Sequence, residues 1–68
     1  MREYLQSMRK EKKLTQKEVA NKLNISESYY NQIENGERQK KMNISLINKL
    51  SKILDISIID LISLEEKD

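Results

Sequence analysis

Apolar residues recur along the chain at intervals of three and four positions, the spacing that places them on one face of an α-helix. The pattern repeats in separate stretches, which are divided by residues that favour turns. The predicted helical segments are residues 2–12, 15–23, 26–35, 44–54 and 58–64. No linker, internal repeat or low-complexity tract interrupts them. We therefore expect an all-α fold in one domain over residues 1–68, with residues 65–68 fraying.

Residues that favour helix ends mark several of these boundaries. Thr15 and Glu18 form a T-x-x-E capping box, which satisfies backbone N–H groups of the first helical turn. Ser26 and Asn43 are good N-caps for the third and fourth segments. Asn24 tolerates the left-handed conformation that ends helices, so we expect it to form the turn after the second segment.

The second and third segments are short and are joined by a tight turn, as in a helix-turn-helix. The small side chain of Ala20 would let the two helix backbones approach closely. On a helical wheel, Tyr30 and Ile33 of the third segment face the core, and the opposite arc is polar and mostly uncharged. The outward residues are Glu27, Ser28, Asn31, Gln32 and Asn35.

The side chains of this outward arc are suited to reading base edges. Asn and Gln pair with adenine, Ser with several bases, and Glu accepts from the cytosine amino group. A face that is merely solvated usually carries Lys and Glu in pairs four residues apart. The pattern therefore favours DNA readout, with a generic polar surface as the alternative.

Charge adds a second indication of a polyanionic partner. The net charge is only +2, yet residues 1–52 carry 12 Lys or Arg against 6 Asp or Glu, and the remainder carries one against five. Many soluble proteins have charged faces without binding nucleic acid, so this observation supports the wheel argument but does not replace it. The cations that frame the polar arc are Lys17, Arg38, Lys40 and Lys41.

The composition argues against an enzyme. Cys and His are both absent, which removes thiol nucleophiles, the commonest metal ligand and the usual general base near neutral pH. We predict no catalytic residues, no metal site and no cofactor. No apolar run has the length of a membrane span, and the N-terminus lacks a signal-peptide pattern, so a cytoplasmic location is expected.

A family resemblance follows from the stretch LTQKEVANKLNISESYYNQIENGER, residues 14–38. It contains T-Q-x-E-x-A, then L-x-I-S, then S-Y-x-x-Q-I-E-N-G, and it resembles the phage repressor and Cro-type (XRE) helix-turn-helix regulators. The resemblance covers residues 2–64. It implies a five-helix, lambda-repressor-like DNA-binding domain and a transcriptional regulator. The expected activity is repression from a two-fold-related double-stranded DNA operator bound by a homodimer.

The resemblance also implies roles for individual positions. Arg9 and Glu34 are expected to form an ion pair that joins the first and third helices. The implied base-contacting residues are Glu27, Ser28, Asn31 and Gln32. The phosphate contacts expected from the resemblance and from the framing charges are Gln16, Lys17, Tyr29, Asn35, Arg38, Lys40 and Lys41.

Three departures from the family pattern stand out. Glu27 is a carboxylate where Gln or Arg is more usual. Lys13 and Asp55 occupy positions where Gly commonly ends a helix, and both are expected to lower stability. The loop that begins at Gly36 is about two residues longer than the common version and lacks its Pro.

Ile59 is a further departure, because the family commonly has an acid there. The last two segments are strongly apolar, and they are expected to complete the core with Ile44, Ile47, Leu50, Ile53, Leu54, Ile58, Leu61 and Ile62. An exposed Ile59 would then suggest a dimer seam, although single exposed apolar residues are also ordinary. The residues assigned to the seam are Ile59, Ile62 and Leu64.

Other functions stay open on the sequence alone. The chain could be a protein-interaction module, such as an antitoxin or a partner of another regulator. As a regulator, it could act by occluding or contacting RNA polymerase. A nuclease or recombinase would need clustered carboxylates, or a nucleophile with a base, and the sequence offers neither constellation.

Overall fold

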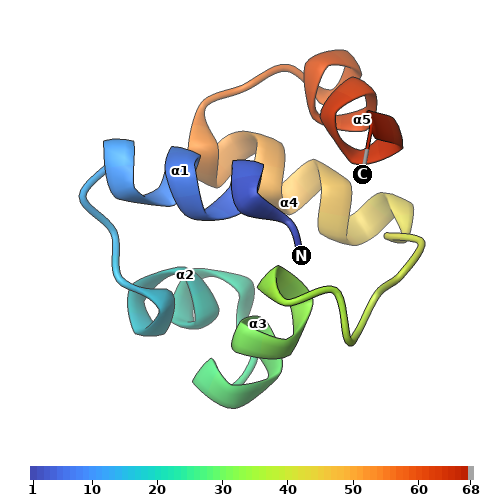
Figure 1. Ribbon diagram of the computed structural model, residues 1–68. Coiled ribbons are helices and arrows are strands. Elements are labelled where there is room, and N and C mark those ends of the chain that lie inside the picture. Colours follow the sequence, from blue (N-terminus) through green and yellow to red (C-terminus); the bar gives the residue numbers. More distant parts are fainter. Residues whose placement is uncertain (68) are drawn as a thin grey trace.

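Five α-helices make up the computed structural model, which describes residues 1–67 (Figure 1). The helices are α1 (Glu3–Glu11), α2 (Gln16–Leu23), α3 (Glu27–Glu34), α4 (Ile44–Leu54) and α5 (Ile58–Lys67). The described residues contain no strand, and the predicted all-α fold is confirmed. None of these helices combines the length and apolar character needed to cross a membrane.

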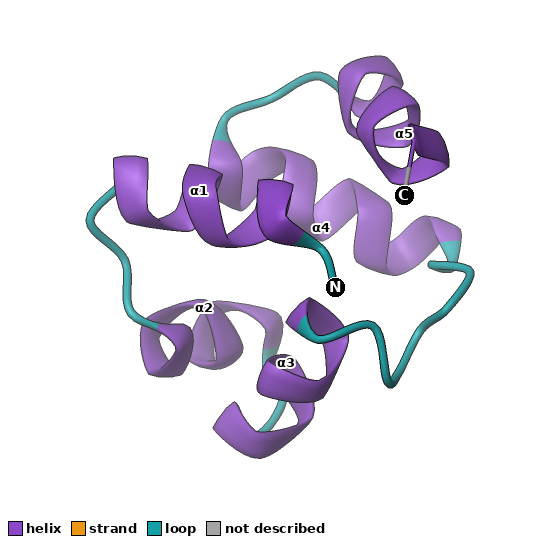
Figure 2. Cartoon of the chain, viewed as in Figure 1, coloured by secondary structure: helices purple, strands orange, loops and turns teal. Residues whose placement is uncertain are grey.

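The five helices pack around one shared core. In Figure 1, α2 and α3 lie below α1 and α4, and α5 lies above α4. Direct packing joins α2 to α3 and to α4, α1 to α3, and α4 to α5. Figure 2 shows that most connections are short, whereas a longer loop runs from α3 to α4 along one edge. This loop, residues 36–43, lies beside the C-terminal end of α3.

The predicted caps are present at the helix starts. Thr15 Oγ1 accepts from the Glu18 N–H at 3.1 Å, and Glu18 Oε1 accepts from the Thr15 N–H at 2.9 Å, which completes the capping box. The side chains of Ser26 and Asn43 each accept from the backbone N–H three residues later. Because these bonds satisfy otherwise unpaired donors, α2, α3 and α4 begin where the sequence predicts.

Left-handed backbone ends three of the helices without glycine. Lys13, Asn24 and Asp55 have φ of 58°, 62° and 56°, as the departures from the family pattern led us to expect at Lys13 and Asp55. Gln39, in the loop between α3 and α4, also has a positive φ of 54°, and nothing in the sequence pattern indicated it. L-residues pay roughly 1–2 kcal/mol in this region, so neighbouring contacts must stabilise each of these turns.

The core draws on all five helices. Its buried members are Leu5, Val19, Ala20, Leu23, Tyr30, Ile33, Leu50, Leu54 and Leu61. Three apolar residues expected in it lie elsewhere: Ile44 is 84% exposed, Ile58 43% and Ile62 40%. Ile44 and Ile58 are the first residues of α4 and α5, so they stand at the helix starts and not in the middle of the packed faces. Only one face of α5 packs on α4, and Leu61 occupies it, which leaves Ile62 at the edge.

The predicted ends of the chain's first and last helices were also wrong. α1 begins at Glu3, and Arg2 precedes it with its side chain buried. α5 continues to Lys67, so residues 65–67 are helical where fraying was expected. The Glu65 carboxylate contacts Arg2 there, and that pair gives the last turn a tertiary anchor. Residue 68, assigned to the same tail, lies outside the described residues.

Candidate nucleic-acid interface

The turn between α2 and α3 brings the two helices into close contact. Asn24 takes the left-handed conformation, and the N–H of Ile25 donates to the Ala20 carbonyl at 3.0 Å. Ala20 is 1% exposed, so its methyl group fills the space between the backbones. A larger side chain there would push α3 away from α2. The left-handed turn at Asn24 and the small buried Ala20 thus accompany the direct packing of α2 on α3.

The outward side of α3 is graded in exposure. Glu27 and Ser28, in the first turn, are exposed, whereas Asn31, Gln32 and Asn35 are half-buried. Tyr30 and Ile33 face the core on the opposite side, as the helical wheel predicted. The polar residues named from the sequence therefore share one face, and its first turn is the most accessible part.

A chain of hydrogen bonds runs from the core to this face. Gln16 Nε2 donates to Glu34 Oε1 at 2.9 Å, and Gln16 Oε1 accepts from Asn31 Nδ2 at 3.2 Å. Asn31 Oδ1 in turn accepts from Asn35 Nδ2 at 3.1 Å. Both ends of the Gln16 amide are used, so it links a buried carboxylate to Asn31. These bonds fix which edge of the Asn31 amide points outward.

The buried carboxylate belongs to the ion pair expected from the resemblance. Arg9 Nε lies 2.7 Å from Glu34 Oε2, with side-chain exposures of 11% and 0%. Arg9 Nη1 also donates to the Leu14 carbonyl at 2.9 Å. Burial raises the pKa of the adjacent Tyr30 phenol, and the nearby Glu34 carboxylate raises it further, so the hydroxyl stays protonated. The pair thus joins α1 to α3 directly beneath the polar face.

Residues of the long loop contact the edge of the polar face of α3 that lies away from Gln16. Arg38 Nε donates to Gln32 Oε1 at 3.0 Å, and Gln39 Nε2 donates to the Tyr29 hydroxyl at 3.0 Å. The loop thereby touches one predicted base contact and one predicted phosphate contact. Gln39 was not among the residues named from the sequence, because its role depends on a backbone turn with no sequence signature.

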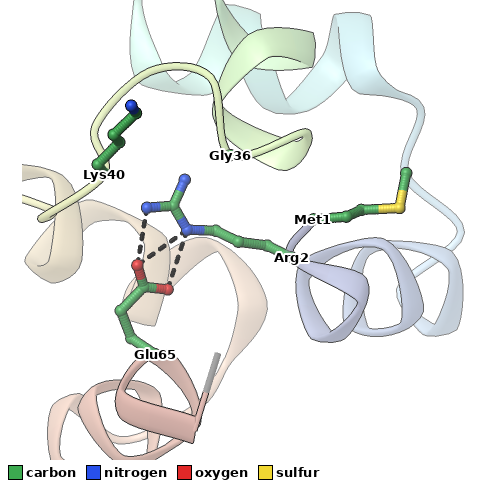
Figure 3. Close-up of a pocket in the computed structure, with 5 residues that line it drawn as sticks. All are labelled: Met1, Arg2, Gly36, Lys40 and Glu65. Atoms are coloured by element: carbon green, nitrogen blue, oxygen red, sulfur yellow. Dashed lines mark hydrogen bonds and ion pairs between the residues drawn. The ribbon is translucent and has the colours of Figure 1, made fainter.

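The predicted phosphate-binding cations lie at two separate places. Lys17 is exposed in the first turn of α2, and Lys40 and Lys41 are exposed in the loop. Lys40 lines a shallow pocket beside Arg2 and Glu65, and its side chain runs away from the Glu65 carboxylate (Figure 3). Lys17 therefore lies on α2, whereas Lys40 and Lys41 lie on the loop, next to Ile62 and Glu66 of α5.

The residues assigned to a dimer seam differ in exposure. Ile59 is 76% exposed and Ile62 40% exposed, whereas Leu64 is partly buried. Ile58 adds an exposed apolar side chain at the start of the same helix. α5 therefore presents an apolar strip on its outer side.

Sequence reasoning missed Arg2 and Glu65. Arg2 stands seven positions before Arg9, two helical turns away, and this spacing could have placed both arginines on the same inner face. Glu65 continues the helical spacing after Leu61, but the acidic composition of the last residues masked it. Among the described residues, no group of three or more acidic side chains could hold a metal ion.

Two short helices at a tight turn, with a polar and accessible second helix, define a helix-turn-helix DNA-binding fold. A family model described as helix-turn-helix matches residues 5–61, so the chain belongs to the XRE-type helix-turn-helix family. This is a family of DNA-binding regulatory domains and not of enzymes, and the protein is a DNA-binding transcriptional regulator. Searches of curated proteins and of solved structures found no match.

Proposed function

We propose that this regulator is a repressor that binds a two-fold-related operator as a homodimer, with α3 of each copy in the major groove. The observation that carries the proposal is the polar face of α3, whose amides are tied to α2 and to the loop. Side chains held in one orientation read bases more selectively than mobile ones, because less conformational freedom is lost on binding. Half-sites would be spaced by about 34–36 Å, one turn of DNA.

Base reading would be divided between two kinds of position. Glu27 and Ser28 are exposed in the first turn of α3 and can reach base edges directly. Asn31 and Gln32 lie one turn further on, with their amides partly engaged within the fold. Gln32 Oε1 would keep its bond to Arg38 Nε, and Gln32 Nε2 would donate to a base edge. The Glu27 carboxylate would accept from a cytosine amino group.

Phosphate contacts would surround the reading face. The N-terminal end of α2 offers backbone N–H groups at a helix start, where anions are favoured, and Lys17 stands beside them. Gln16 would use its remaining hydrogen-bonding capacity there. The other proposed phosphate contacts are Tyr29, Asn35, Arg38, Lys40 and Lys41.

The dimer would form through the apolar strip of α5, with Ile59, Ile62 and Leu64 at the seam. Burying this strip against a second copy would add apolar area to the small core of a 68-residue chain. A two-fold axis there would present the two α3 helices to successive major grooves. Repression would follow from excluding RNA polymerase at the operator.

Selection of bound duplexes from a random pool at near-physiological salt tests the DNA-binding part. We expect a two-fold-related consensus. Gln32→Ala should lose about 1–3 kcal/mol on the selected duplex and little on a random one. Lys17→Ala should weaken both alike and lower the salt slope by about one unit. A pool that yields no consensus would refute sequence-specific repression.

Sedimentation of Ile59→Glu tests the dimer. The variant should be monomeric, with helical circular dichroism unchanged, because the side chain is exposed in the single copy. Ser7→Glu, an equal change of charge at an exposed position of α1, is the matched control and should still dimerise. A wild-type chain that is monomeric at high micromolar concentration, with and without DNA, contradicts the proposed dimer.

A second candidate rests on the same strip. An apolar face on α5 would also suit a different protein, so the chain could act as an antitoxin or as the partner of another regulator. DNA binding that fails while a complex with such a partner forms through Ile59 would identify this function.

A further inference from the structure

Arg2 is a buried cation that holds α5 to the rest of the fold. Its residue is 4% exposed, and its Nε lies 2.9 and 3.0 Å from the two carboxylate oxygens of Glu65. Its Nη2 lies 2.7 Å from Glu65 Oε1 (Figure 3). The Tyr4 hydroxyl donates to the same carboxylate. Glu65 is thus engaged from two residues at the start of the chain.

The other side of the same guanidinium contacts the loop. Arg2 Nη1 donates to the carbonyls of Ile33 at 2.5 Å and Arg38 at 3.2 Å, and Nη2 donates to the carbonyl of Gln39. The Arg2 backbone N–H donates to the Glu34 carbonyl at 2.8 Å. Arg2 therefore joins the C-terminal end of α3 to two consecutive loop residues. One of these, Gln39, has the positive φ that is otherwise unfavourable.

Those two loop residues are the ones that contact the DNA-reading side of α3. Arg38 donates to Gln32, and Gln39 donates to Tyr29. A continuous set of contacts therefore runs from Glu65 through Arg2 and the loop backbone to the polar face. Arg2 holds the backbone carbonyls of Arg38 and Gln39. It therefore also holds the Cα atoms from which these two side chains extend.

We propose that Arg2 and Glu65 are positioning residues for DNA binding, which hold the loop so that Gln32 and Tyr29 are oriented for the duplex. This inference rests on the proposed function. Glu65 orients the guanidinium, whose planar fork reaches the carboxylate and three carbonyls at once. A lysine is a point charge without that geometry and could not replace it. Arg2→Lys therefore separates the charge of Arg2 from its shape.

For Glu65→Ala, a role in stability alone and a role in positioning predict opposite changes in the affinity for DNA. Removing an acid raises the net charge by one unit, which by charge alone strengthens binding to a polyanion. Positioning predicts that Glu65→Ala weakens binding to the selected duplex in spite of this. Glu66→Ala makes the same change of charge at the exposed neighbouring residue, and it is the matched control.

The experiment measures duplex affinity and loop order in the same variants, at a temperature where circular dichroism shows each of them folded. The probes are the duplex selected by the wild-type chain and a random duplex of equal length. Arg2→Lys and Glu65→Ala should each weaken binding to the selected duplex about tenfold, and to the random duplex by a smaller factor, because the loop positions the proposed phosphate contact Tyr29 as well as the proposed base contact Gln32. Glu66→Ala should not weaken either. Arg2→Lys keeps the proposal testable if Glu65→Ala does not fold.

Hydrogen exchange of the free protein reports on the loop without DNA. The N–H groups of Glu37 and Arg38 donate to the Gln32 carbonyl, and their exchange should accelerate at least about tenfold in Arg2→Lys but not in Glu66→Ala. If Arg2→Lys, Glu65→Ala and Glu66→Ala all bind the selected duplex as tightly as the wild-type chain does, the inference alone is overturned. A wild-type chain that binds no duplex overturns the proposed function and this inference together.

Discussion

Replacing Glu34 with methionine is expected to destabilise the fold severely. The Glu34 carboxylate is fully buried and accepts from Arg9 Nε at 2.7 Å and from Gln16 Nε2 at 2.9 Å. Without it, the Arg9 guanidinium keeps only its bond to the Leu14 carbonyl among the contacts described above, while its side chain is 11% exposed. A buried cation would be left without a counter-charge.

The size of the effect follows from this burial. Removing one partner of a buried ion pair costs about 3–5 kcal/mol. A chain of 68 residues has a total stability of roughly 3–10 kcal/mol, at about 0.05–0.15 kcal/mol per residue. Glu34→Met should therefore remove a large part of the free energy of unfolding. At about 4–8 °C per kcal/mol, the melting temperature should fall by well over 10 °C.

Urea titration followed by circular dichroism at 25 °C measures the loss, and a double-mutant cycle identifies its cause. Replacing both Arg9 and Glu34 by methionine removes the unpaired charge, and apolar replacements of buried ion pairs are often neutral or stabilising. The double variant should therefore be more stable than Glu34→Met by more than about 2 kcal/mol. Glu37→Met, at an exposed neighbouring position, is the control and should change stability by less than about 0.5 kcal/mol.

Two outcomes would refute this reasoning. If Glu34→Met unfolds at the wild-type urea concentration, the pair is screened by water in solution. If the double variant is as unstable as Glu34→Met, the loss comes from packing around position 34 and not from the charge left on Arg9.

Three further predictions concern the helix ends and the reading face. Lys13→Gly should raise stability by up to about 1 kcal/mol in a urea titration, because glycine adopts the observed φ of 58° without strain; an unchanged or lower midpoint contradicts this. Hydrogen bonds from the backbone and side chain of Thr15 hold the pKa of Glu18 below its ordinary value of 4.5. The ionised Glu18 carboxylate therefore stabilises the fold above pH 4.5, and this stabilisation is lost as the pH falls through the lowered pKa. Glu18→Gln should therefore lower the urea midpoint at pH 7 but not at pH 2, and equal effects at both values would exclude the carboxylate as the cause. Glu27→Gln should raise affinity for random duplexes and change the preferred base at one position of each half-site; selection that returns the wild-type consensus shows that Glu27 reads no base.

The helices could be predicted from the sequence because their signals are local. The capping box of Thr15 and Glu18 lies within four residues, and Asn24 carries its own preference for the left-handed turn. The side of α3 that faces the core also follows from periodicity alone, as Tyr30 and Ile33 illustrate. These features depend on neighbours in the chain, so one sequence is enough to find them.

Contacts between distant segments could not be predicted in the same way. Arg2 and Glu65 are 63 positions apart, and neither the burial of Arg2 nor the helical state of residues 65–67 has a local signature. Ile44 fits the apolar stripe of its helix, yet it is 84% exposed at the first position of α4. The position of Gln39 depends on carbonyls held by Arg2, and it too is visible only in three dimensions.

The graded exposure of α3 has a consequence for how such a regulator changes over generations. Within residues 1–67, the side chains of Glu27 and Ser28 make no hydrogen bond to the rest of the chain, so replacing them leaves the fold's contacts intact. Asn31 is bonded to Gln16 and Asn35, and its replacement disturbs a network that reaches the core. On the proposed function, duplicated copies would diverge toward new operators first at positions 27 and 28, because replacing Asn31 would also break its bonds to Gln16 and Asn35. Two such regulators would come to bind different operators through substitutions in the exposed first turn of α3.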